Sequence, residues 1–160
     1  MCIRDRVDAD ALNLLALDPM TLPADWILTP HPGEAARLLG STVQDIQNDR
    51  FGAAHSLAEK FKAIVVLKGA GTIVAAPDHR PAVFGAGNPG MAVGGMGDLL
   101  TGVIAALRAQ GQPAFDAACV GALLHAAAGD EAARDGGERG LLPSDLLPRL
   151  RRLSNPDNVR

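Results

Sequence analysis

The sequence predicts an α/β fold with a mainly parallel sheet and flanking helices, and three observations carry this prediction. Residues 63–67 form a continuous apolar run rich in β-branched side chains, which is typical of a strand buried on both faces of a parallel sheet. Strand-like and helix-like segments alternate in the first half of the chain. After Asp98 the apolar residues recur at helical spacing, so helices dominate the second half. This order of segments indicates one α/β domain.

The elements of the first half follow from short apolar runs and the turns between them. We expect a strand to end at residues 7–8, and a second strand over residues 26–29 leads into a Pro/Gly turn. Helical spacing and an N-terminal capping pair predict a helix over much of residues 42–61. The runs at residues 72–76 and 82–84 follow the buried strand at short intervals, which suggests hairpin-like additions to the sheet.

Three helices are predicted for the second half. The first begins near Asp98 and ends near Gly111, and a long Ala-rich helix follows over residues 115–134. Ser144 can cap a last helix that continues through Leu153.

Composition excludes several classes of function. The chain has 160 residues, 48% of them hydrophobic, which suits one domain with a real core. Its net charge of −3 gives no general attraction for nucleic acid or acidic membrane, so specific loops must hold any phosphate. Two cysteines, Cys2 and Cys119, supply neither a disulfide framework nor a four-ligand zinc set, and they fit a reducing, cytoplasmic setting. No apolar run approaches the roughly 20 residues that cross a bilayer.

The chain ends are interpreted separately from the domain. Residues 1–6 carry three charges immediately before a strand-like segment, and we interpret them as a non-native remnant that replaces missing chain. The alternative is a genuine, solvated start. Residues 7–153 are expected to form part of one domain, and residues 154–160 a tail.

A glycine-rich stretch before the second-half helices is the most informative motif. Glycines without Cβ atoms let backbone N–H groups converge, and the helix that follows adds the positive end of its dipole. We therefore expect an anion hole at Gly94, Gly95, Met96 and Gly97. Asp98, at its mouth, is either a helix cap or the base that takes a proton from an attacking hydroxyl.

The same stretch resembles a known family. Asn88-Pro89-Gly90-Met91-Ala92 followed by Gly95-Met96-Gly97-Asp98 looks like the signature of ADP-dependent NAD(P)H-hydrate dehydratases, whose shorter G-x-G-D element also occurs in ribokinase-like kinases. The resemblance implies a ribokinase-like fold. It also implies that Asp98 is the catalytic base and contacts the substrate, and that Asn88 binds the substrate.

Two further segments match the family in the same order. Thr29-Pro30-His31-Pro32-Gly33-Glu34 resembles the loop that binds the hydrated nicotinamide, so the resemblance makes His31 a substrate-binding residue. The alternative is a histidine bonded within its own loop. The second segment resembles the family's nucleotide loop. The resemblance makes nucleotide-binding residues of Lys68, Gly69, Ala70, Gly71 and Thr72, and also of Gly97. Its alternative is a hairpin turn with a solvated lysine.

The start of the domain also matches, and one later helix carries two reactive residue types. One segment, with Asp8, Asp10 and Asn13, resembles the family's DADAL motif. The resemblance implies that these residues border either the substrate pocket or a shell of Mg²⁺-bound water, and we assign Asp10 to the substrate pocket. Acidic residues at a strand end are also common turn formers. His125 and Cys119 lie among apolar residues of the Ala-rich helix, where we interpret both as structural.

The resemblance implies an activity, its co-substrates and two alternatives. ADP, or ATP in some members, would drive dehydration of (6S)-NADHX or NADPHX to NADH or NADPH, with AMP and phosphate released and Mg²⁺ as cofactor. We assign no protein metal ligands and no nucleic-acid or membrane partner. Fusion to an NAD(P)H-hydrate epimerase is common in the family, and homo-oligomerisation is left open. The alternatives are a vitamin-precursor kinase of the same fold and a non-catalytic nucleotide-binding fragment.

The matched region begins at the DADAL-like segment, whereas the family has further N-terminal strands and a substrate loop. We therefore expect the fold to be partial and the 160-residue chain to be inactive alone.

Overall fold

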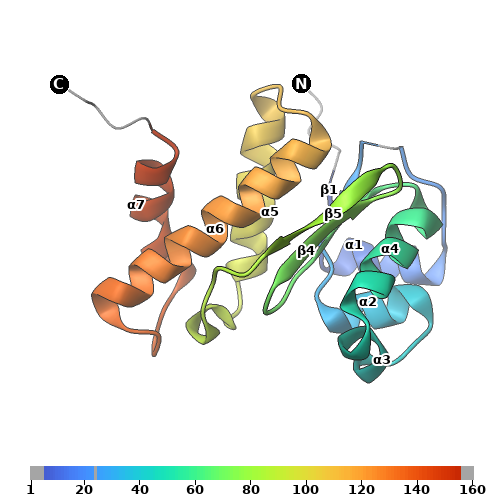
Figure 1. Ribbon diagram of the computed structural model, residues 1–160, viewed down its shortest axis with the longest axis horizontal. Coiled ribbons are helices and arrows are strands. Elements are labelled where there is room, and N and C mark those ends of the chain that lie inside the picture. Colours follow the sequence, from blue (N-terminus) through green and yellow to red (C-terminus); the bar gives the residue numbers. More distant parts are fainter. Residues whose placement is uncertain (1–5, 24, 156–160) are drawn as a thin grey trace.

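The computed structural model describes residues 6–23 and 25–155, which form one sheet covered by helices (Figure 1). The strands are β1 Arg6–Val7, β2 Ile27–Leu28, β3 Ile64–Leu67, β4 Thr72–Ala76 and β5 His79–Phe84. The helices are α1 Asp10–Leu17, α2 Pro32–Leu39, α3 Val43–Asn48, α4 Arg50–Phe61, α5 Met96–Ala109, α6 Ala114–Gly136 and α7 Pro143–Leu153, with a 3-10 turn, η1, at Pro89–Met91. The predicted remnant and tail lie mostly outside the described residues, although Arg6 belongs to β1.

The described sheet has the order β1-β2-β3-β4-β5. Strands β1, β2 and β3 are parallel, whereas β3–β4 and β4–β5 are antiparallel. Residues 68–71 between β3 and β4 are too few for the crossover that a parallel strand needs, so β4 must run back. The α/β class and the hairpin-like addition are confirmed, but the expectation of a mainly parallel sheet holds only for β1 to β3.

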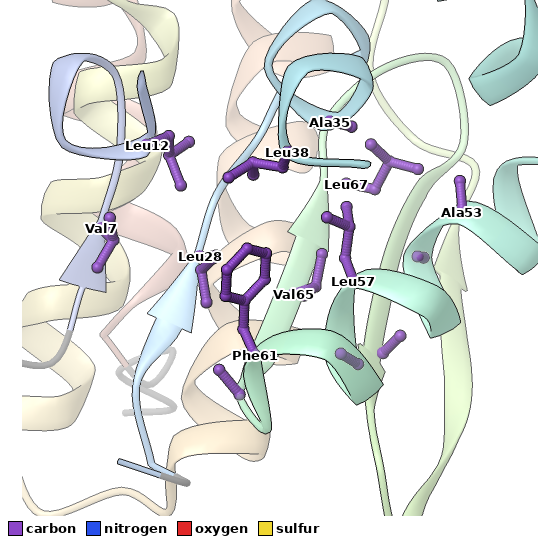
Figure 2. Packing of buried hydrophobic residues seen from close by; sticks show 14 of the residues in the cluster. Val7, Leu12, Leu28, Ala35, Leu38, Ala53, Leu57, Phe61, Val65 and Leu67 are labelled. Atoms are coloured by element: carbon purple, nitrogen blue, oxygen red, sulfur yellow. The ribbon is translucent and has the colours of Figure 1, made fainter. Parts of the chain in front are cut away.

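Helices cover both faces of this sheet. Leu28, Val65 and Leu67 point toward α1, α2 and α4, where Leu38 and Phe61 are fully buried against them (Figure 2). The alternate residues of the same strands, including Ile27, Ile64 and Val66, pack instead against α5 and α6. Burial on both faces explains why β3 is a continuous apolar run.

The second half of the chain forms a helical layer beside the sheet, with α7 packed on α6 (Figure 1). Gly121 lets α6 approach α5 closely, because a Cβ at this position would lie 2.6 Å from Cγ1 of Ile104. No helix of the described residues is long and apolar enough to cross a membrane.

Several predicted element boundaries differ from the structure. The helix expected over residues 42–61 is two helices that break at Asp49, whose side chain accepts a hydrogen bond from the Gly52 amide and caps α4. Helix α5 begins at Met96, two residues before Asp98. Ser144 lies inside the first turn of α7 rather than at its cap, where the Asp145 carboxylate accepts the Leu142 amide instead.

Candidate active site

A polar network lies where the parallel strands β1, β2 and β3 end. The Asp8 carboxylate accepts hydrogen bonds from the Lys68 ammonium group at 3.0 Å and from the Thr101 hydroxyl at 2.7 Å. Thr29, which is fully buried, lies with its hydroxyl 3.4 Å from that of Thr101. Three strand ends and helix α5 are therefore joined at one point, the position at which open α/β sheets bind their ligands.

Asp8 is held in its charged form by these contacts. Partial burial raises the pKa of Asp8, but the hydrogen bond from Thr101 and the charge and hydrogen bond of Lys68 together lower it below its usual value. The segment that resembles DADAL thus contributes a partly buried anion to the network. Asn13 accepts a hydrogen bond from Arg37, and Asp10 is exposed at the start of α1.

His31 and Glu34 form a reciprocal cap on helix α2. Nδ1 of His31 accepts the amides of Gly33 and Glu34 at 3.0 and 3.3 Å, and the buried Glu34 carboxylate accepts the His31 amide at 2.7 Å. Glu34 also lies 3.8 Å from the Lys68 ammonium group. His31 is thus bonded within its own loop, yet half of its side chain stays exposed and it lines the cavity described next.

One cavity of about 810 Å³ brings the motif loops together. Its volume lies in the range of sites for ligands of nucleotide size. The predicted site residues that line it are His31, Lys68, Gly69, Ala70, Gly71, Thr72, Asn88, Met96 and Gly97. Four others do not line it: Asp10, Gly94, Gly95 and Asp98.

Only part of the expected anion hole faces the cavity. Gly97 is placed against Lys68, because a Cβ there would lie 3.0 Å from the lysine Nζ, whereas Gly94 has nothing within 4 Å. Gly95 has a φ of 90° and is the N-cap of α5, and the Met96 amide donates to the Val93 carbonyl. The amides at the start of α5, including that of Gly97, are those that lack partners within a helix.

Asp98 follows Gly97 on the first turn of α5, and its side chain is exposed. No side-chain cap hydrogen bond is found at the N-terminus of this helix. The structure therefore gives no support to Asp98 as the helix cap, and it places Asp98 next to the cavity rather than in its lining.

Asn88 is held by a residue that the sequence analysis missed. Its side-chain amide donates to Asp130 of α6 at 3.0 Å, and its oxygen accepts the Gly90 amide at 3.1 Å. The other oxygen of Asp130 accepts the Gly87 amide at 3.0 Å. A Cβ at Gly90 would lie 2.3 Å from the carbonyl oxygen of Glu138, so only glycine fits there. This loop forms one wall of the cavity.

Two residues interpreted as structural differ in their relation to the cavity. His125 is buried but lines it, and its Nε2 atom has no hydrogen-bond partner among the described residues. Burial and the charge of Lys68 lower its pKa to about 4, against an opposing contact with the Met96 backbone, so the ring is neutral at physiological pH. Cys119 is partly buried, and burial with the nearby Asp116 raises its pKa to about 11.

The described residues contain no group of three or more His, Cys, Asp or Glu side chains that could hold a metal ion. A nucleotide-bound Mg²⁺ needs fewer protein ligands, since it is commonly held by one or two carboxylates together with phosphates and water.

Solved structures establish the class of fold. An ADP/ATP-dependent NAD(P)H-hydrate dehydratase from Bacillus subtilis, co-crystallised with ATP/Mg²⁺ and soaked with CoA, superposes with a TM-score of 0.81 at 34% identity. The alignment covers 92% of this chain and 54% of that one. A ribokinase-like superfamily protein from Enterococcus faecalis also reaches 0.81, at 28% identity, over 92% of this chain and 51% of that one. The chain therefore has a ribokinase-like α/β fold.

The family follows from sequence comparison. The family model for NAD(P)H-hydrate dehydratase matches residues 6–152, and the chain belongs to this family. A bifunctional NAD(P)H-hydrate repair enzyme of Coxiella burnetii is 53% identical over 94% of this chain and 30% of its own length. An ADP-dependent (S)-NAD(P)H-hydrate dehydratase of Neisseria meningitidis is 48% identical over 93% of this chain and 52% of its own. The chain thus spans between about a third and a half of these relatives.

Proposed function

We propose that the chain provides the nucleotide-binding part of an ADP-dependent enzyme that dehydrates (6S)-NADHX or NADPHX to NADH or NADPH, with release of AMP and phosphate. The observation that supports this proposal is that one cavity of about 810 Å³ joins the His31 loop, the loop at residues 68–72 and Gly97. The names of relatives support it, since one is an ADP-dependent (S)-NAD(P)H-hydrate dehydratase.

The proposed reaction combines a kinase step with an elimination. The hydroxyl group of the hydrated nicotinamide attacks the terminal phosphoryl group of ADP, Asp98 takes the hydroxyl proton, and AMP leaves. Backbone amides at Gly97 and along residues 94–97 stabilise the charge on the transferred group. The ring nitrogen then supplies electrons that expel phosphate, and loss of a proton from the neighbouring carbon restores the double bond. The net reaction is that of a hydro-lyase.

The binding roles divide along the cavity. His31 and Asn88, with Asp10 and Asp98 at the margin, are proposed to contact the hydrated nicotinamide. Gly97 and residues 68–72, from Lys68 to Thr72, are proposed to contact ADP, or ATP. Both sets line one cavity, apart from Asp10 and Asp98, which supports binding of the two ligands next to each other. The division between the ligands rests on the resemblance of each segment to the family.

Mg²⁺ fits this proposal as an ion that the nucleotide phosphates carry, where it would neutralise their charge. The Bacillus subtilis relative was co-crystallised with ATP/Mg²⁺, which supports this assignment. We assign this ion no protein ligand of its own. A fused or separate NAD(P)H-hydrate epimerase is the proposed partner, and relatives named bifunctional NAD(P)H-hydrate repair enzymes support a second activity on the same chain. A reducing cytoplasm is the proposed setting.

The test compares wild type with Asp98→Asn. Turnover is followed as the reappearance of NADH absorbance after (6S)-NADHX, ADP and Mg²⁺ are mixed. The variant should bind ADP with unchanged affinity, while kcat falls by about 100-fold or more because the base is lost. Both proteins are measured as the 160-residue chain and in a version extended at its N-terminus with the corresponding segment of a longer relative.

Normal turnover by Asp98→Asn would remove Asp98 from the mechanism. An extended wild-type protein that phosphorylates a vitamin alcohol but leaves (6S)-NADHX unchanged would instead favour the kinase alternative.

A further inference from the structure

One side chain, that of Arg50, hydrogen-bonds to three carbonyl groups in and beside the loop between β3 and β4. Nη2 of Arg50, the first residue of α4, donates to the carbonyl oxygens of Leu67, Lys68 and Gly71 at 3.3, 3.5 and 3.1 Å. The helix dipole disfavours a cation at this end of α4, and burial lowers the pKa of the guanidinium group. Arg50 thus occupies an unfavourable position. Its Nη1 donates to the Gln47 side chain at 3.3 Å, and the hydrogen bonds of its Nη2 are all to the loop.

The amide groups of the loop are used differently. Gly69, Ala70 and Gly71 line the cavity, and their N–H groups donate no hydrogen bond within the part of the chain that the structure describes. A trans peptide directs its C=O and N–H groups to opposite sides. When the Lys68 carbonyl faces Arg50, the Gly69 amide must therefore face away from it.

The Gly69 carbonyl of the turn is bound by a different side chain. The Thr72 hydroxyl donates to the Gly69 carbonyl at 3.2 Å, which fixes the peptide between Gly69 and Ala70. Gly69 and Gly71 have φ values of 139° and 70°, a path that favours glycine and that is typical of loops whose successive amides form an anion-binding concavity. A Cβ on Gly69 would also lie 2.8 Å from Nη1 of Arg50.

We propose that Arg50 is a positioning residue that orients this loop, so that its free amides face the cavity and bind a phosphate group of a nucleoside diphosphate. The inference rests on the proposed function, because it takes ADP as the ligand. Residues 68–72 contain no carboxylate, so no acidic side chain of the loop itself repels an anion at these amides. Arg50 acts from behind the loop and does not itself contact the nucleotide.

A matched control lies on the same helix. Lys60, near the other end of α4, also donates to a backbone carbonyl, that of Leu38, at 2.6 Å, and it does not line the cavity. The test measures the affinity of the 160-residue chain for ADP and for adenosine by calorimetry, in wild type, Arg50→Met and Lys60→Met. Arg50→Lys is a milder second variant, and circular dichroism with thermal unfolding shows that each variant is folded.

Arg50→Met should weaken ADP binding by about 10-fold or more, because charge-assisted hydrogen bonds to phosphate are lost, and should leave adenosine affinity within about twofold. Arg50→Lys should lose less, and Lys60→Met should change neither affinity. If Arg50 had a purely structural role, Arg50→Met would weaken the binding of ADP and of adenosine together. That result, or unchanged ADP binding by a folded Arg50→Met protein, would overturn the inference while the proposed function stands. If wild type in its extended version binds no ADP at all, the proposed function fails as well.

Discussion

The wall of the cavity that contains Asn88 depends on one carboxylate from a distant helix. Asp130 accepts the Gly87 amide with one oxygen and the Asn88 side chain with the other, both at 3.0 Å. The substitution Asp130→Ala removes both bonds. Asp130→Asn should keep the bond from the Gly87 amide, but it places the NH₂ group of the new side chain opposite the NH₂ group of Asn88.

The expected cost follows from the burial of these groups. A hydrogen bond to a charged group contributes about 1.5–3 kcal/mol, but Gly87 is exposed and Asp130 only partly buried, so the lower end applies. At about 1.5 kcal/mol for each of the two bonds, we expect Asp130→Ala to lower the free energy of unfolding by about 3 kcal/mol and Tm by about 6–12 °C. The loop should also lose order, which raises the apparent KM for the hydrated nicotinamide.

A double exchange tests whether geometry or charge at Asp130 matters. Three hydrogen bonds are involved: Gly87 amide to residue 130, Gly90 amide to residue 88, and the bond between the two side chains. In Asn88→Asp/Asp130→Asn each of them has a donor and an acceptor again, because residue 130 now donates to residue 88. Thermal unfolding should show that the double variant recovers most of the stability lost in Asp130→Asn. Asp116→Ala, an exposed aspartate on the same helix, is the control and should cost a few tenths of a kcal/mol. If the double variant is no more stable than Asp130→Asn, the described bonds do not hold the loop.

Two further predictions concern the anion hole and the polar network. Gly97→Ala should leave the fold stable but weaken ADP binding, because its Cβ would lie 3.0 Å from Nζ of Lys68, whereas Gly94→Ala, with nothing within 4 Å, should bind ADP normally in the same calorimetric assay. Equal effects of both substitutions would contradict this placement of the anion hole. The pKa of Asp8 lies below its usual 3.8, so its contacts contribute stability above that pH that is lost as pH falls through the lower folded value. Urea unfolding should therefore show a deficit for Asp8→Asn at about pH 7 that shrinks below about pH 4, and a constant deficit would refute the ion pair.

The sequence predicted those parts of the site that depend on local pattern. Lys68 and Gly97 each follow a recognisable element, the first a buried strand and the second a glycine-rich run. Ligand loops gather at the carboxyl ends of parallel strands, so the two had to meet once the strands were correctly placed. Helices α1 and α2 were not predicted, because their short Ala- and Leu-containing segments follow residues that also form turns.

The residues that orient these loops could not be found in the same way. Arg50 contacts a loop 17 to 21 residues further along the chain, and Asp130 contacts Gly87 and Asn88 across 43 and 42 residues. Each looks like an ordinary charged residue on a helix surface, since nothing in its neighbouring sequence indicates the partner. Only the packing of α4 beside β3 and β4, and the path of α6 past the Asn88 loop, brings these groups together.

The surroundings of Lys68 explain why loop amides matter for an anion in this cavity. Its ammonium group lies 3.0 Å from the carboxylate of Asp8 and 3.8 Å from that of Glu34, so one cation stands beside two carboxylates. A buried carboxylate requires such a partner, and the lysine charge is therefore largely balanced by the protein itself. Lys68 therefore stabilises an incoming phosphate less than the position of the lysine in the cavity suggests. The amides of Gly69, Ala70 and Gly71 have no such counter-charge. Arg50 binds the Lys68 and Gly71 carbonyls of the same loop without adding an acidic group, so these amides are anion donors for which no carboxylate competes.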